Sequence, residues 1–187
     1  MDLPVGDSYE RICEQFTWDI PEYFNIADAV CDRWADDSGR IAMTHEAYDG
    51  STTDYTFSQI KRLSNQLANL LTNLGLHRGD RVLVMLTQSP ECAISHLACF
   101  KSGIVSCLAS VLFGPDAIKH RLLATDAKVC ITNSANLAKV QEVEAQCPSL
   151  LQVIVVDEES PTKAMPLWSS LKGQAETFQN VRTHSEE

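Results

Sequence analysis

Hydrophobic residues recur along this chain with two spacings, one typical of helices and one typical of strands. Leucines and isoleucines fall on one helical face between Ser58, which can cap a helix, and Gly75, which can end one. We therefore expect a long helix with a buried face in this stretch. Upstream, apolar and polar positions alternate on both sides of the turn dipeptide Asp49-Gly50. This alternation predicts a β-hairpin made of residues 41–47 and 53–57.

Farther along, short apolar runs rich in β-branched residues alternate with amphipathic helical segments. This order predicts parallel strands joined by right-handed helical crossovers. The sequence therefore predicts an α/β fold with a doubly wound, mostly parallel sheet, together with N-terminal helices and the β-hairpin. The expected strands are residues 82–86, 104–109, 129–132 and 153–156, and the expected helices open at Pro90 and Pro115 or span residues 137–145.

The two ends of the chain differ from this repeating middle. Apolar residues have helical spacing after a possible N-cap at Asp7 or Ser8, and again between Asn25 and Trp34. After residue 156 the pattern weakens to a short amphipathic turn around Trp168. We therefore expect an N-terminal helical arm, an α/β subdomain and a polar connector, with bounds at residues 1–40, 41–156 and 157–187.

The composition narrows the classes of partner. A length of 187 residues is enough for one domain with a buried core. Fifteen lysines and arginines stand against twenty-five aspartates and glutamates, a net charge of −10 that argues against nucleic acid and anionic membranes as partners. No apolar run reaches the roughly 18 residues of a membrane helix, and the acidic start is unlike a signal peptide. We therefore expect no membrane span and a cytoplasmic location.

The residues that could carry chemistry form no recognisable catalytic motif. Seven cysteines without CxxC or CxxH spacing predict buried free thiols rather than a zinc site or disulfides. The turn after the first strand of the expected sheet, Thr87-Gln88-Ser89-Pro90, has no glycine to bring main-chain N–H groups close to a phosphate. Dinucleotide, Walker A and nucleophile-elbow motifs are also missing from the sequence. From the residues alone we expect no catalytic residue and no metal site.

Several short strings, taken in order, resemble a known family. They are similar to strings in the N-terminal region of the adenylate-forming (AMP-dependent) acyl-CoA synthetases, and the string Phe113-Gly114-Pro115-Asp116-Ala117 resembles the branch with acetyl- and medium-chain enzymes. The resemblance covers about residues 23–156 and implies a partial N-terminal subdomain of the acyl-CoA synthetase fold. The strings are Tyr55-Thr56-Phe57, Leu63 to Asn69, Leu74-Gly75-Leu76, Gly79-Asp80-Arg81-Val82, Ser89-Pro90-Glu91, Lys101 to Val105, Leu112 to Ala117, and Asp126 to Thr132.

The reaction that this resemblance implies is a two-step ligation. ATP and a carboxylate give an acyl-adenylate and pyrophosphate with the help of magnesium (Mg), and coenzyme A (CoA) then takes the acyl group as a thioester. The family's phosphate loop, Tyr-Gly-x-Thr-Glu segment, ribose-binding aspartate and adenylation lysine have no counterpart in this chain. We therefore expect the chain to be inactive alone and to bind none of these cofactors strongly. Its implied partner is the missing C-terminal part of the synthetase or a separate catalytic half.

One contact of the family falls within this chain. In acetyl-CoA synthetases the loop that resembles residues 111–114 lies against the CoA nucleotide, so the resemblance makes Phe113 and Gly114 candidate cofactor-binding residues. A loop that closes onto the helix opening at Pro115 explains the same residues equally well. Asp126 stands where the family usually has glycine, and we expect it to adopt a positive φ.

Two other functions remain open at this point. The chain could be a non-catalytic interaction module that docks on a separate catalytic half, which co-purification with a polypeptide carrying the phosphate loop would indicate. It could also be a flavodoxin-like binder of a small molecule, which a bound ligand on purification would reveal.

Overall fold

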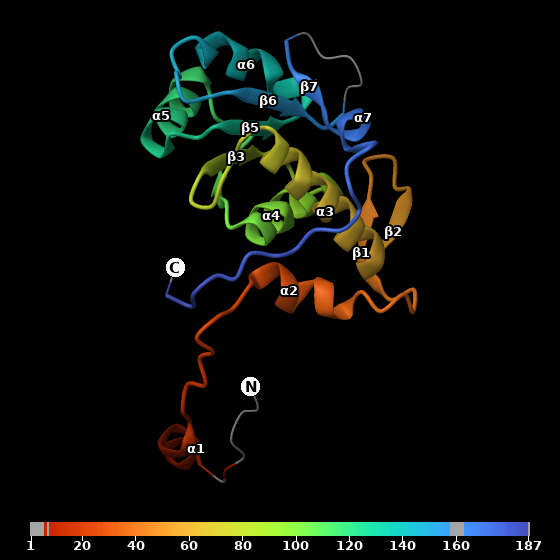
Figure 1. Cartoon of the computed structure of the whole chain (residues 1–187), viewed down its shortest axis with the longest axis vertical. Coiled ribbons are helices and arrows are strands. Elements are labelled where there is room, and N and C mark those ends of the chain that lie inside the picture. Colours follow the sequence, from red (N-terminus) through yellow and green to blue (C-terminus); the bar gives the residue numbers. More distant parts are fainter. Residues whose placement is uncertain (1–5, 7, 158–162, 187) are drawn as a thin grey trace. The chain divides into compact units, whose positions relative to one another are not determined.

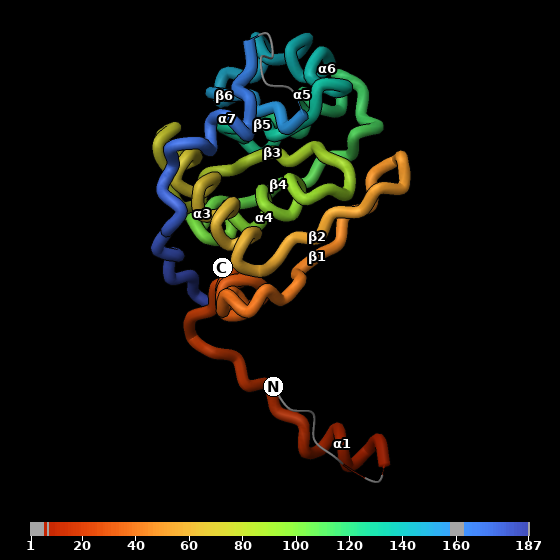
Figure 2. The backbone as a smooth tube through the Cα atoms, turned by 90° about the vertical axis from the view of Figure 1, so that its right-hand side faces the viewer, coloured from red at the N-terminus to blue at the C-terminus, as the bar shows by residue number. Residues whose placement is uncertain are grey.

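The computed structural model describes residue 6, residues 8–157 and residues 163–186. The chain forms two units, one made of Met1–Phe24 with Arg182–Glu187 and the other of Asn25–Val181. Figure 1 labels most of the helices and strands, and Figure 2 labels β4.

The first unit contains helix α1 and a short pairing of residues 22–24 with the last described residues. Helix α1, Tyr9–Gln15, begins after Ser8, whose hydroxyl accepts a hydrogen bond at 3.3 Å from a main-chain N–H of the first turn. The predicted helix is therefore confirmed with Ser8 as its cap, and the alternative cap Asp7 lies outside the described residues. Tyr23 forms an antiparallel bridge with His184.

A five-stranded sheet forms the centre of the second unit (Figure 1). Its strands are β3 Arg81–Met85, β4 Val105–Leu108, β5 Val129–Thr132, β6 Gln152–Val155 and β7 Met165–Pro166. They run parallel in the order β4-β3-β5-β6-β7. The four strands that the sequence predicts are confirmed, whereas the two-residue strand β7 is not predicted by the pattern.

Helices cover both faces of this sheet, as a doubly wound fold predicts (Figure 2). The long helices are α3 Phe57–Asn73, α4 Pro90–Ser102, α5 Pro115–Thr125 and α6 Ser134–Glu144. Successive residues of β3 enter opposite cores: Val82 lies in one with Leu67 of α3, and Leu83 lies in the other with Val140 of α6. Because strand side chains alternate between the faces, β3 is buried on both sides.

The start of α3 differs from the prediction by two residues. Thr56 is the N-cap: its hydroxyl accepts from Gln59 N at 3.2 Å, and Gln59 Oε1 accepts from Thr56 N at 2.8 Å. This reciprocal capping box satisfies two main-chain donors, so the prediction of a Ser58 cap is wrong. The predicted stop is confirmed, because the helix ends before Gly75, which has a φ of 85°.

The hairpin strands β1, Ile41–Glu46, and β2, Thr52–Thr56, form a separate antiparallel sheet. This confirms the predicted hairpin, although Phe57 belongs to α3 rather than to the strand.

The remaining short elements fit the pattern less closely. Helix α2, Ile26–Val30, begins after Asn25 as predicted, but the 3-10 helix η1, Asp32–Trp34, replaces its expected continuation. Helix α7, Leu167–Leu171, confirms the short amphipathic turn. Asp126 has the expected positive φ, 48°. In the parts of the chain that the structure describes, no helix has the length and apolar character needed to span a bilayer.

The cysteines are all free thiols, and their burial predicts which of them react. Burial raises the pKa of Cys99 and of Cys130 to about 12, whereas Cys13 is exposed. At pH 8 a thiol with that pKa is ionised in roughly one molecule in 10,000. We therefore expect an aromatic disulfide reagent to modify Cys13 first in the native protein, with labelled peptides identified by mass spectrometry. In urea all seven cysteines should react at similar rates; native labelling of Cys99 as fast as Cys13 would contradict this.

Candidate functional site

The loop between β4 and α5, residues 109–114, lies at the edge of the sheet where this class of fold places its sites. β4 and β5 lie on opposite sides of β3, so the connections on the two sides of β3 run in opposite directions. In open α/β sheets, ligands bind outside the carboxyl ends of the strands at such a switch point. The loop that contains Phe113 and Gly114 begins at the carboxyl end of the edge strand β4, one strand away from the switch point between β3 and β5.

The loop holds its two candidate residues differently. Phe113 N donates to Ser110 O at 3.1 Å, and the Phe113 ring packs against the core beneath α5 and α6. Gly114 is the N-cap of α5 and has no side chain to accept hydrogen bonds from the first turn. A Cβ placed on Gly114 would meet no atom within 4 Å. The loop is thus anchored by its aromatic ring and open at its glycine.

Two cations from later helices lie at the same loop. The Arg121 guanidinium carbon is 4.8 Å from the centroid of the Phe113 ring. Lys139 of α6 donates to Val111 O at 3.2 Å and to Asn136 Oδ1 at 2.8 Å. The sequence analysis does not identify Lys139, because no motif links it to the loop and only the packing of α6 beside α5 brings it there.

This arrangement suits a ligand that joins a planar ring system to anionic groups. An aromatic ring beside a guanidinium offers a surface on which a planar group can pack. Two cations and the uncapped start of a helix reduce the cost of bringing negative charge to the loop. The contacts of Phe113, Arg121 and Lys139 therefore support binding of such a ligand at this loop.

The other turns at the switch point use their polar groups within the fold. Ser89 Oγ accepts from Cys92 N at 3.3 Å and caps α4. Ser134 N, at the start of α6, donates to Asp157 Oδ1 at 2.7 Å. These groups cap helices and join loops, so this part of the structure gives no support to a flavodoxin-like phosphate site.

One histidine makes a close polar contact away from the loop. His96 Nδ1 lies 2.6 Å from Ser106 Oγ, and the His96 ring stacks on Phe100 with 6.4 Å between the centroids. Burial lowers the pKa of His96, which favours the neutral imidazole at pH 7. The hydrogen bond satisfies a half-buried ring on the flank of α4.

Comparison with known proteins shows which family this chain resembles. The family described as AMP-binding enzyme matches residues 31–187. The chain is 31% identical over 172 residues to the Mus musculus protein named acyl-coenzyme A synthetase ACSM3, mitochondrial, covering 88% of this chain and 29% of that protein. It is 30% identical to the Homo sapiens protein named acyl-coenzyme A synthetase ACSM2B, mitochondrial, covering 90% of this chain and 30% of the relative.

Solved structures show the same fold. The crystal structure of a Brucella canis acyl-CoA synthetase superposes with a TM-score of 0.84 at 23% identity, over 95% of this chain and 34% of that one. The anthranilate CoA ligase AuaEII, solved with anthranoyl-AMP, gives a TM-score of 0.78 at 23% identity, over 89% of this chain and 31% of its own. This chain therefore spans about a third of the length of the proteins that it matches. Since the family match covers most of the sequence, the chain belongs to the AMP-binding enzyme family.

Proposed function

We propose that this chain is the N-terminal part of an acyl-CoA synthetase and that it does not complete the family reaction alone. The observation that carries the proposal is the family match over residues 31–187 in a chain about a third as long as its relatives. The complete reaction joins a carboxylate to CoA and converts ATP to AMP and pyrophosphate. The division into residues 1–40, 41–156 and 157–187 stays a prediction.

Phe113 and Gly114 serve in this proposal as contacts for the CoA nucleotide. The fit rests on the open space at Gly114 and on two cations beside the loop, Arg121 and Lys139. The ring of Phe113 offers an apolar surface to the base, and the cations offset phosphate charge. CoA, when bound, supplies the thiol that accepts the acyl group.

ATP and Mg do not fit the residues of this chain in the same way. Its eight glycines are scattered, so no segment can present a row of main-chain N–H groups to the phosphates. Within residues 8–157 and 163–186, no group of three or more His, Cys, Asp or Glu side chains could hold a metal ion. We therefore assign no adenylation step to residues of this chain.

Calorimetric titration with CoA and a pyrophosphate-exchange assay test the proposal together. We expect measurable CoA binding that weakens about fivefold in Lys139→Ala, the loss of about 1 kcal/mol that one charged contact typically gives. Lys172→Ala, which removes an exposed lysine elsewhere, is the matched control and should bind CoA normally. Carboxylate-dependent pyrophosphate exchange should be absent.

Two results would contradict these expectations. The loop does not contact CoA if the wild type, Phe113→Ala and Lys139→Ala bind CoA with equal affinity. The same conclusion follows if the wild type does not bind CoA at all. Pyrophosphate exchange that persists after rigorous removal of host synthetases would show that the chain has an active site of its own.

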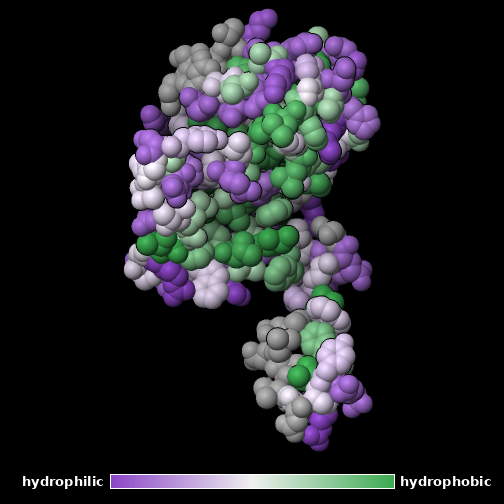
Figure 3. All heavy atoms as spheres, turned by 180° about the vertical axis from the view of Figure 1, so that it is seen from behind, coloured by the Kyte–Doolittle hydropathy of each residue, from purple (hydrophilic) through white to green (hydrophobic). Residues whose placement is uncertain are grey.

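A non-catalytic interaction module is the second candidate, and one observation favours it. Val105 and Leu108 of the edge strand β4 are exposed, as is Leu112 in the following loop. Figure 3 shows apolar side chains gathered in a band across one face of the second unit. Exposed apolar groups of this kind are typical of surfaces that another polypeptide covers. Co-purification with a separate chain that carries the phosphate loop would support this candidate.

The compartment also remains a proposal. A cytoplasmic location is the prediction from the sequence, whereas the relatives above carry the word mitochondrial in their names. Cell fractionation with markers for both compartments decides between the two.

A further inference from the structure

The segment formed by residues 174–181, here called the strap, crosses α3 and α4 without forming a helix or strand (Figure 1). Side-chain amides of α3 donate to main-chain carbonyls along it. Asn65 Nδ2 reaches Glu176 O at 2.8 Å, and Asn69 Nδ2 reaches two carbonyls, those of Ala175 at 2.9 Å and Thr177 at 3.0 Å. Side chains of α3 therefore hold this part of the strap by the main-chain carbonyls of the strap.

Asn65 and Asn69 lie one turn apart on α3, and together they bind three consecutive carbonyls of the strap, those of residues 175, 176 and 177. Within the strap, Gln174 and Val181 donate main-chain N–H groups, to Leu171 O at 3.0 Å and Lys101 O at 2.8 Å.

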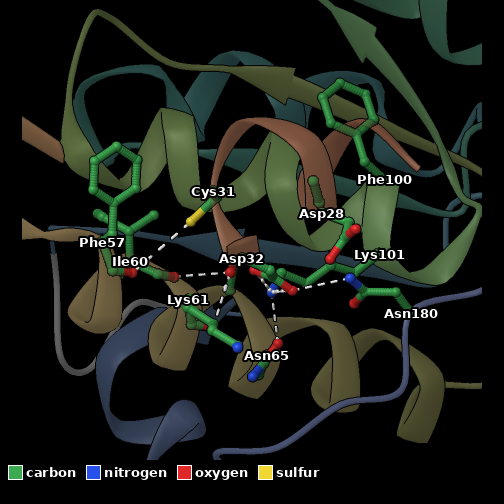
Figure 4. Close-up of polar contacts among 12 residues, drawn as sticks. Asp28, Cys31, Asp32, Phe57, Ile60, Lys61, Asn65, Phe100, Lys101 and Asn180 are labelled. Atoms are coloured by element: carbon green, nitrogen blue, oxygen red, sulfur yellow. Dashed lines mark hydrogen bonds and ion pairs between the residues drawn. The ribbon is translucent and has the colours of Figure 1, made fainter. Parts of the chain in front are cut away.

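A buried ion pair lies under the far end of the strap (Figure 4). Lys101 Nζ donates to both carboxylate oxygens of Asp32, at 2.6 and 2.8 Å, and to Asn65 Oδ1 at 2.7 Å. Asn180 of the strap donates to Asp32 Oδ2 at 2.9 Å. Burial lowers the pKa of Lys101, and the hydrogen bond and charge of Asp32 oppose that shift. The ion pair thus joins η1, α3, α4 and the strap.

Asn65 couples the two sets of contacts. Its Oδ1 accepts from Lys101 while its Nδ2 donates to the strap, so the buried charge fixes the orientation of the amide. An amide held in one orientation loses little freedom when it binds a carbonyl, which strengthens the contact.

We propose that Asn65, Asn69 and Lys101 form a latch that holds the strap closed and lets it open as a unit while the sheet stays folded. Opening breaks the hydrogen bonds from Asn65 and Asn69 to strap carbonyls and those that Asn180 and Val181 donate to the body, and it breaks no bond of the sheet. Such segments open at a lower free energy than the core of the same protein. The latch also assigns a role to Asn65, Asn69 and Lys101, which lie in strings that the sequence analysis singled out. This inference does not depend on the proposed function.

Hydrogen exchange of the full chain, read at the N–H group of Val181, tests the latch, because this N–H donates to Lys101 O outside the strap. Asn69→Ala is the variant, because it removes donors to two strap carbonyls and places a strong helix former on α3. We expect exchange at Val181, and cleavage after Glu176 by a glutamyl endopeptidase, to accelerate about tenfold. Exchange in β3 and β5 should be unchanged.

The matched control is Asn73→Ala on the same helix. Asn73 contacts only the side chain of Gln174 among the strap residues, at 2.9 Å, so strap exchange should stay at the wild-type rate. The proposal is overturned if Asn69→Ala leaves strap exchange within twofold of wild type. It is equally overturned if β3 and β5 accelerate by the same factor as the strap, since that would show global unfolding, or if the Asn73→Ala control accelerates as much.

Discussion

Replacing Lys101 by methionine should destabilise the protein by about 3–5 kcal/mol, the usual cost of breaking one side of a buried ion pair. Lys101 is completely buried, and the side chain of its partner Asp32 is 7% exposed. Without the ammonium group the Asp32 carboxylate would stay buried with Asn180 as its remaining side-chain partner. Urea unfolding at pH 7, followed by circular dichroism, measures the loss.

Lys128→Met is the matched control for this variant. Lys128 also contacts an aspartate at 2.8 Å, but its side chain is 33% exposed and that of Asp80 is 15% exposed. Water screens such a pair, so the control should lose no more than about 1 kcal/mol. Adding Asp32→Asn to Lys101→Met should restore part of the stability, because it removes the unpaired charge. Equal losses in the two methionine variants would contradict the role assigned to Lys101.

The strands and long helices could be predicted because the residues of each element show its hydrophobic pattern within that segment alone. β3 and β5 are continuous apolar runs bounded by turns, and α3 has one apolar face. The wrong start of α3 lies where two local signals compete. Thr56 and Ser58 are both capable caps, and the glutamine three residues after Thr56 decides between them.

The candidate site could be predicted only in part. Phe113 and Gly114 are neighbours in sequence and belong to one string, whereas Lys139 reaches their loop through the packing of two helices. The Lys101–Asp32 pair joins residues 69 positions apart, and lysine is rarely buried, so no local pattern indicates it. Contacts of this kind depend on which strands and helices are neighbours. The sequence pattern predicts the fold class but not these neighbours.

Leu67→Ala should cost about 2–5 kcal/mol of unfolding free energy, since it leaves a cavity in the core between α3 and the sheet. Leu67 lies at the middle of the apolar face that predicts α3, and none of its side chain is exposed. Alanine favours the helix at least as well as leucine, so the loss reports on packing rather than on helix formation. Urea denaturation of the full chain gives the difference.

Leu112→Ala makes the same chemical change at a leucine that is 88% exposed, and it should alter stability by less than about 0.5 kcal/mol. The comparison separates burial from the loss of a leucine as such. If Leu67→Ala lost as little as Leu112→Ala, the face of α3 could not be packed against the sheet. The interpretation of its apolar spacing as a core face would then fail, together with the placement of α3 beside β3.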